Sequence, residues 1–233
     1  MSLGDATWDE CTRAHGRCCK RRGWTVALAL LVYTAAAHAA VHLDLAQARQ
    51  LQLTGRDAQA VRAYTRILAH SPGLASAWVG RGQSELALGR SEAARADFAH
   101  WIKLDPGNPY AAIWVEIAAL RSDPHGAAPQ PPTARDRRNW PQPIVRYLAG
   151  QIDWETMFDA ALAAPKHDRG PRVCEAALFY GEKLLAAGKM KRALSGFALV
   201  GRARCPARRA LRALARSEYE RLYRAGYREP PVE

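Results

Sequence analysis

The most restrictive feature of this chain is a set of residues that recurs after 34 positions. The recurring pairs are Gly55 and Gly89, Ala60 and Ala94, Tyr64 and Phe98, and Pro72 and Pro106. Between them, small and apolar residues return at the three- and four-residue spacings of helices with one buried face. A repeat of this length predicts pairs of antiparallel helices that stack in sequence order.

Each residue type in the repeat has a physical task. The glycine ends the first helix, because it accepts the left-handed backbone conformation through which the chain reverses. The alanine lets the second helix approach closely, and the aromatic ring fills the space between the two helices. The proline stops the second helix before the next pair begins.

These residues resemble the tetratricopeptide repeat (TPR) family, which has the same period. Trp78 and Gly82 stand at the family's tryptophan and glycine positions, so 41–74 and 75–108 resemble consecutive repeats, and a partial third begins at 109. The resemblance implies an all-α solenoid of helical hairpins with an irregular middle and a C-terminal capping helix.

A later stretch fits the same template. Gly181, Gly188, Ala193 and Phe197 keep the intervals of the second copy. The offset from Gly89 to Gly188 is 99 residues, whereas three periods require 102. The part between the two copies is therefore irregular.

The sequence predicts four segments after the N-terminal one. They are TPR helices at 40–121, a loop with four prolines at 122–139, TPR-like helices at 140–226 that include the capping helix at 207–225, and a tail at 227–233. Within the irregular part we expect a short helix near Pro143 and a helix capped by Asp153. We also expect the chain to break at Pro165 before the next helix starts at Val173.

The predicted capping helix is amphipathic. Its apolar residues are Leu211, Leu214, Tyr219 and Leu222, and its arginines face elsewhere. A solenoid needs such a polar-backed helix because its final hairpin has no neighbour. This helix explains much of the formal net charge of +12, which fits either a solvated surface or an anionic partner.

The N-terminal segment 1–39 has the layout of a secretory signal. A basic stretch ends at Arg22, an apolar core follows, and Ala37 and Ala39 stand at the −3 and −1 positions of a cleavage site. No charged residue occurs between Arg22 and Asp44, so an uncleaved segment that anchors the chain in the inner membrane is the alternative. In both cases the remaining chain is exported, and we expect it in the periplasm.

Cleavage after Ala39 leaves two of the five cysteines, Cys174 and Cys205. Two cysteines in an exported protein predict a disulfide, whereas two buried free thiols are the alternative. In the TPR template both lie at the same end of the last hairpin. A bond there closes a 32-residue loop and stabilises the repeat by on the order of 3 to 4 kcal/mol.

The C-terminal half carries a second resemblance. Its motifs are Trp140-Pro141, Cys174-Glu175, Phe179–Glu182 and Gly188. With the repeats before them, they are similar to bacterial periplasmic NlpI-like TPR adaptors over roughly 41–223. The resemblance implies a non-catalytic adaptor of a group in which some members bring cell-wall hydrolases to a protease. Residue 40 is alanine, so the lipidation cysteine of the lipoprotein members is absent.

No catalytic or metal-binding motif occurs after the predicted signal. The GxSxG, SxxK, HExxH, Walker and CxxC patterns are absent. The histidines of this part are His42, His70, His100, His125 and His167, and no two stand four residues apart. We therefore expect a binding protein with no cofactor and no metal site, and an enzyme assembled from distant residues is the weaker alternative.

The first helices of stacked repeats line a concave groove that suits peptides. The predicted groove residues are His42, Leu45, Arg49, Gln52, Ser76, Val79, Gln83, Leu86, Tyr110, Ile113 and Ile117. We expect a protein-interaction scaffold of the cell envelope that is linked to the regulation of cell-wall enzymes. A homodimer is compatible with this expectation. In the rival interpretation, the basic face from Arg202 to Arg228 binds an anionic envelope polymer or lipid. Export disfavours nucleic acid as a partner.

Overall fold

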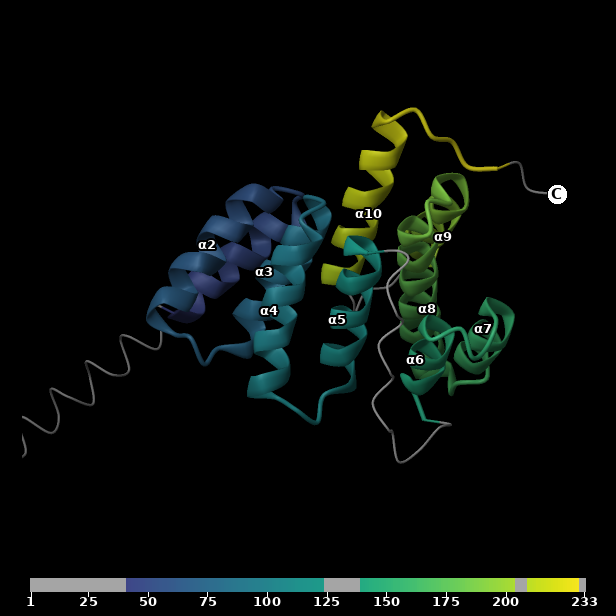
Figure 1. Cartoon of the computed structure of the whole chain (residues 1–233), viewed down its shortest axis with the longest axis horizontal. Coiled ribbons are helices and arrows are strands. Elements are labelled where there is room, and N and C mark those ends of the chain that lie inside the picture. The colour runs from purple at the N-terminus through teal and green to yellow at the C-terminus, as the bar shows by residue number, and fades with distance from the viewer. Residues whose placement is uncertain (1–40, 124–138, 204–208, 231–233) are drawn as a thin grey trace, which may run out of the picture. The chain divides into compact units, whose positions relative to one another are not determined.

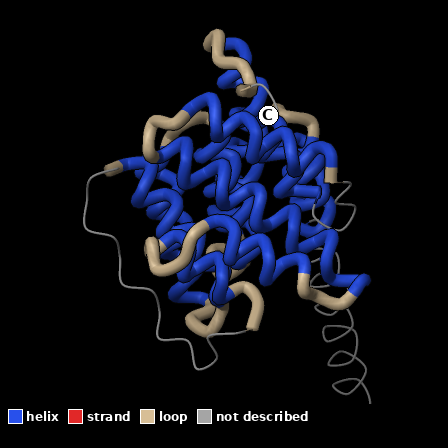
Figure 2. The backbone as a smooth tube through the Cα atoms, turned by 90° about the vertical axis from the view of Figure 1, so that its right-hand side faces the viewer, coloured by secondary structure: helices blue, strands red, loops and turns tan. Residues whose placement is uncertain are grey.

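The computed structural model describes residues 41–123, 139–203 and 209–230. The chain divides into two compact units, Met1–Asp44 and Leu45–Glu233, and the architecture below is that of the second unit. All regular structure in the described ranges is helical, and these ranges contain no strand (Figure 2). The predicted all-α class is confirmed.

Successive helices pack against one another along the chain. A first helix covers residues 41–53. The later helices are α2 (Asp57–His70), α3 (Ala75–Ala87), α4 (Ser91–Leu104), α5 (Pro109–Ser122), α6 (Gln142–Leu148), α7 (Trp154–Leu162), α8 (Lys166–Ala186), α9 (Met190–Arg202) and α10 (Arg209–Arg224). The most extensive contacts join α2 to α3, α3 to α4, α4 to α5, and α8 to α9 (Figure 1). The helices therefore form a stacked array in sequence order.

Three hairpin turns have a glycine where the repeat pattern predicts it. The φ angles of Gly55, Gly89 and Gly188 are 74°, 76° and 70°. A side chain makes this left-handed conformation unfavourable, so glycine is the residue that lets each first helix end in a tight reversal. The predicted role of these glycines is confirmed.

An aromatic ring packs directly on a glycine in two of the hairpins. A Cβ atom added to Gly82 would lie 2.6 Å from Cε1 of Phe98, and one added to Gly181 would lie 2.8 Å from Cε1 of Phe197. Both rings are buried. Helices α3 and α4 therefore pack more closely than a larger residue at position 82 would allow. Helices α8 and α9 do the same around position 181.

We expect Gly82→Ala to lower the free energy of unfolding by about 1–2 kcal/mol. The added methyl group meets the Phe98 ring, and this overpacking outweighs the gain of about 1 kcal/mol in helix propensity. Urea unfolding followed by circular dichroism measures the change. Gly107→Ala is the matched control, because nothing lies within 4 Å of its added Cβ atom. Equal unfolding midpoints for the two variants would contradict the tight contact.

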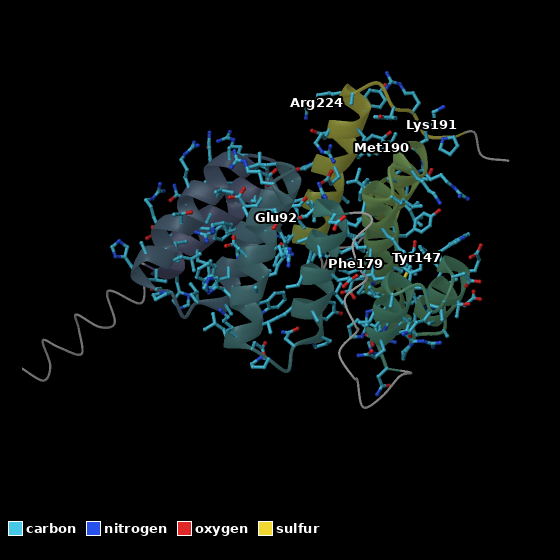
Figure 3. All side chains as sticks on the ribbon, viewed as in Figure 1. Glu92, Tyr147, Phe179, Met190, Lys191 and Arg224 are labelled. Carbon is cyan, nitrogen blue, oxygen red and sulfur yellow. The ribbon has the colours of Figure 1, made fainter. Side chains whose placement is uncertain are left out.

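Helix α5 joins the early helices to the late ones. Its first turn is capped by Asn108, whose side chain accepts a hydrogen bond from Tyr110 N at 3.1 Å. The Trp114 ring stacks on Phe98 of α4, with centroids 5.5 Å apart, and meets the edge of Phe179 of α8 at 5.2 Å. Figure 3 shows Phe179 on the side of α8 toward α5. One aromatic cluster therefore continues the core across the irregular middle.

Helix α8 begins earlier than the sequence predicts. It starts at Lys166, so the expected break before Val173 is wrong. Asp168 lies in the first turn, where a negative charge is favourable, and it accepts a hydrogen bond from Arg172 at 3.1 Å. Pro171 removes one backbone hydrogen bond inside the helix, and these local interactions offset only part of that loss.

The predicted start of α7 is confirmed, since the Asp153 side chain accepts a hydrogen bond from Thr156 N at 2.8 Å. Other predictions fall outside the described residues, among them the signal segment 1–39, most of the proline-rich loop and Cys205. Cys174 lies inside α8 and is completely buried. Within the described ranges, no helix has both the length and the hydropathy of a membrane span.

Candidate binding pocket

The last helix does more than cap the last hairpin. Helix α10 packs on α9 and α8, and it also contacts α3 (Figure 1). Arg216 Nη2 donates a hydrogen bond to Leu53 O at 2.6 Å, and Ser217 Oγ lies 3.2 Å from Asp57 Oδ2. The helix therefore bridges the last hairpin and the first, and it covers part of the inner face of the array.

A buried ion cluster fastens α10 to α5 and α8. Arg121 Nη1 lies 3.0 Å from Glu182 Oε2 and 2.6 Å from Glu218 Oε1, and Nη2 donates to Leu86 O at 3.1 Å. Both glutamate side chains are completely buried, and that of Arg121 is 6% exposed. Moving α10 away would leave the other charges buried without their full set of partners, which is costly. We infer that α10 is a fixed part of the pocket wall.

A pocket of about 700 Å³ lies between the first helix, α3, α5, α8 and α10. Its apolar lining comes from Leu53, Val79, Trp101, Trp114, Phe179 and Leu211. Its polar lining includes Arg49, Gln52, Ser76, Gln83, Asn108, Tyr110 and Arg209. The pocket thus combines a broad apolar surface with groups that form hydrogen bonds, as ligand sites usually do.

Two glutamines and a tyrosine form a hydrogen-bond network in the pocket wall. Gln52 Nε2 donates to Gln83 Oε1 at 3.1 Å, and Tyr64 Oη donates to Gln52 Oε1 at 3.0 Å. All three side chains are buried among the first helix, α2 and α3. Burial raises the pKa of Tyr64 to about 12, so its hydroxyl stays protonated and keeps its hydrogen bond. This network holds the wall in one arrangement.

The acidic residue of the pocket is held from two sides. Tyr110 Oη donates to Glu175 Oε2 at 2.8 Å, and Trp140 Nε1 donates to the same oxygen at 2.6 Å. Glu175 is 1% exposed. Its charge is therefore shielded, and the exposed charges of the lining are those of Arg49 and Arg209.

The predicted groove residues separate into those that line the pocket and those that do not. The ones that line it are Arg49, Gln52, Ser76, Val79, Gln83 and Tyr110. Those buried in the core are Leu45, Leu86, Ile113 and Ile117. His42 is exposed on the first helix and is not part of the lining.

The prediction that the four buried residues form part of the groove surface is wrong. In α5, Ile113 and Ile117 are 1% and 0% exposed, which leaves them no surface for a partner. The reason is that α5 packs against α8 as well as against α4 and α6, so little of its surface is left open. Leu86 is also completely buried, near the Arg121 side chain that bonds to its carbonyl oxygen. These side chains stabilise the core rather than the pocket surface.

Several lining residues were not predicted. Trp101, Arg209 and Leu211 come from α4 and α10, outside the first helices that the repeat template assigns to a groove, and Glu175 and Phe179 come from α8, the first helix of the later copy. One signal in the sequence was available in α10, because Glu218 stands on the apolar face between Leu214 and Leu222. A charged residue at such a position indicates a buried ion pair, although it does not name the partner.

Comparison with known proteins identifies no family for this chain: no protein-family model matches it, and no curated protein matches it significantly. Within the described residues, no three histidine, cysteine or acidic side chains are grouped so that they could hold a metal ion.

Proposed function

We propose that the chain is an exported, non-catalytic TPR-type adaptor that binds a protein or peptide partner in the pocket beside α10. The observation that carries this proposal is the pocket lining, which brings the first helix, α3 and α5 together around an apolar surface. These are the first helices of successive repeats in the TPR interpretation. The volume of about 700 Å³ lies within the range of about 300–1,000 Å³ that is typical of ligand sites.

The TPR interpretation is supported by contacts that recur at equivalent positions. Gly82 receives the ring of Phe98, and Gly181 receives the ring of Phe197 in the same way. In both hairpins a left-handed glycine follows seven residues after the first one, at Gly89 and Gly188. A shared sequence interval and a shared packing contact argue for one repeating unit.

The position of α10 narrows the class of partner. A long helix lying along the whole inner face would compete with α10, which is tied down by the buried Arg121 cluster. A short extended segment needs only the pocket. Its apolar side chains would pack on Trp101 and Leu211, and its backbone would bond to polar groups such as Ser76 and Asn108. We therefore favour a short peptide segment of a partner protein.

Export, the envelope location and the disulfide belong to the same proposal. They are supported by the signal-like segment 1–39 and by the complete burial of Cys174 in α8. In an oxidising compartment a bond from Cys174 to Cys205 would tie the end of α9 to α8. An uncleaved N-terminal segment would instead anchor the adaptor to the inner membrane, and a link to cell-wall enzymes rests on the NlpI-like resemblance.

Blocking the pocket should abolish partner binding. In the variant Arg49→Ala/Ser76→Trp, a lining cation is lost and a bulky ring enters the pocket, so the proteins captured from envelope extracts should fall at least tenfold in a quantitative mass-spectrometric comparison. The control Ala58→Trp/Arg62→Ala makes the same exchange at exposed positions of α2 outside the pocket. If both variants retain the same captured proteins, the pocket is not the binding site.

The protein purified for the capture experiment also shows whether the N-terminal segment is cleaved and whether the disulfide forms. We expect a mature N-terminus at Ala40, and a Cys174–Cys205 link in a non-reducing peptide map. An intact N-terminal segment would support the anchor alternative. Two free thiols in the exported protein would reject the disulfide but would not test the pocket, because Cys174 is not part of its lining.

A further inference from the structure

A second cavity lies beside α10, and more arginines line it than line the first. Its volume is about 660 Å³, and α9, α10 and the end of the first helix form its walls. We call it the arginine cleft, after the arginines that line it: Arg202, Arg209, Arg212 and Arg216. Glu229 is the acidic residue in its lining.

The four arginines are not equally free to bind a ligand. Arg202 pairs with Glu229 at 2.8 Å, and Arg216 donates to Leu53 O at 2.6 Å. Arg209 and Arg212 are exposed, and neither forms an ion pair or side-chain hydrogen bond with another described residue. The cleft therefore presents two guanidinium groups, on one helix and three residues apart, that carry unneutralised positive charge.

The rest of the cleft is apolar. Leu53, Phe197 and Tyr219 contribute to its walls together with alanines of α9 and α10. A small inorganic anion would use only the guanidinium groups and leave this surface exposed to water. A molecule with a charged group joined to an apolar part would cover both.

We propose that the arginine cleft binds the head group of an anionic phospholipid. The phosphate would lie between Arg209 and Arg212, whose planar guanidinium groups suit paired hydrogen bonds to phosphate oxygens. The glycerol and the first acyl carbons would pack on Leu53 and Tyr219, which are both partly exposed in the cleft. Leu53 and Arg209 line both cavities, whereas Arg212 lines the cleft and not the peptide pocket, so Arg212→Gln tests the cleft by itself.

The test is calorimetric titration of the full-length protein with short-chain lipids below their micelle concentration. Dihexanoyl phosphatidylglycerol is the anionic probe, dihexanoyl phosphatidylcholine is the probe without net charge, and inorganic phosphate is the probe without an apolar part. We expect the phosphatidylglycerol to bind tightest of the three. Its affinity should fall as sodium chloride is raised from about 50 to about 500 mM, since salt screens exposed charges.

Two variants locate the site. Arg212→Gln should weaken phosphatidylglycerol binding about fivefold, and Arg209→Gln/Arg212→Gln about 25-fold, if each arginine near a lipid head group contributes as basic residues usually do. Arg62→Gln/Arg66→Gln is the matched control, because it removes two exposed arginines from α2. It should bind like the unchanged protein.

Several outcomes would overturn the inference. Equal affinity for the two lipids would show that charge is not recognised. If inorganic phosphate binds as tightly as phosphatidylglycerol, the apolar wall of the cleft does not contribute to binding. An equal loss in the α2 control would assign the effect to total charge rather than to the cleft. A loss of lipid binding by Arg212→Gln with unchanged partner capture would support the inference, because Arg212 lines the cleft and not the peptide pocket.

Discussion

Arg121→Met should lower the free energy of unfolding by about 3–5 kcal/mol, because it removes one side of a buried ion cluster. Glu182 and Glu218 are both 0% exposed and would lose the cation that lies 3.0 Å and 2.6 Å from them. Arg221 would still pair with Glu218, but Arg221 is 42% exposed and reaches only that glutamate. Urea unfolding at neutral pH measures the loss.

A triple variant distinguishes an ionic role from a steric one. Arg121→Met/Glu182→Leu/Glu218→Leu removes all three buried charges, and apolar residues of similar size often replace such clusters at little or no cost. We therefore expect the triple variant to regain most of the stability that the single variant loses. If the single variant unfolds within about 1 kcal/mol of the unchanged protein, the cluster does not fasten α10 as we infer.

The loss should depend on pH. Burial raises the pKa of Glu182 above its ordinary value, although the Arg121 charge acts in the opposite direction. A raised carboxyl pKa means that the folded state holds the proton more tightly than the unfolded state, so stability falls as pH rises through the interval between the two pKa values. Without Arg121 that fall becomes larger. Arg121→Met should therefore cost more at pH 8 than at pH 5.

Trp114→Ala should destabilise the protein by about 3–5 kcal/mol, the usual cost of removing a large buried aromatic side chain. Trp114 is 2% exposed. Its ring contacts Phe98 of α4 and Phe179 of α8, so the substitution opens a cavity where the early and late helices meet. Because Trp114 also lines the peptide pocket, the variant should enlarge that pocket.

The matched control is Trp154→Ala, which makes the same exchange at the start of α7. Trp154 is 41% exposed, and its ring neighbours are Phe158 and Tyr180. We expect a loss of about 1 kcal/mol or less, the size of one partly exposed aromatic contact. Guanidinium unfolding followed by circular dichroism compares the two variants. A similar loss for both would mean that Trp114 does not connect the two groups of helices.

The parts of the fold that follow from local rules could be predicted from the sequence. Gly55, Gly89 and Gly188 stand where a left-handed residue is needed, and each has the predicted backbone conformation. Asp153 caps a helix because its side chain can bond to a backbone N–H group three residues later. Both features depend on residues that are neighbours in the chain, so their pattern is visible in one sequence.

The start of α8 shows where local rules fail. Pro165, Gly170 and Pro171 together predict a break, yet the helix runs on from Lys166. Proline and glycine each add a limited cost, and packing of α8 against α5, α7 and α9 outweighs it. That packing involves residues distant in sequence, which local propensity cannot include.

The pocket shows the same limit. Arg49, Ser76 and Val79 could be placed on its lining by repeat position, because the inner face of a stacked helix follows from the repeat. Ile113 and Ile117 could not be excluded in this way, since their burial depends on α8 crossing α5. The position of α10 depends on Glu218 meeting Arg121, 97 residues earlier in the chain.

The sequence by itself determined that this is an all-α array with reversals at spaced glycines, because helix periodicity and turn conformation are properties of neighbouring residues. Tertiary structure alone decided that α10 returns to the first helix and lines two cavities, one of which is rich in arginines. The physical reason is that burial and charge pairing are settled between residues far apart in the chain, where the gain from removing each group from water depends on which partner it meets.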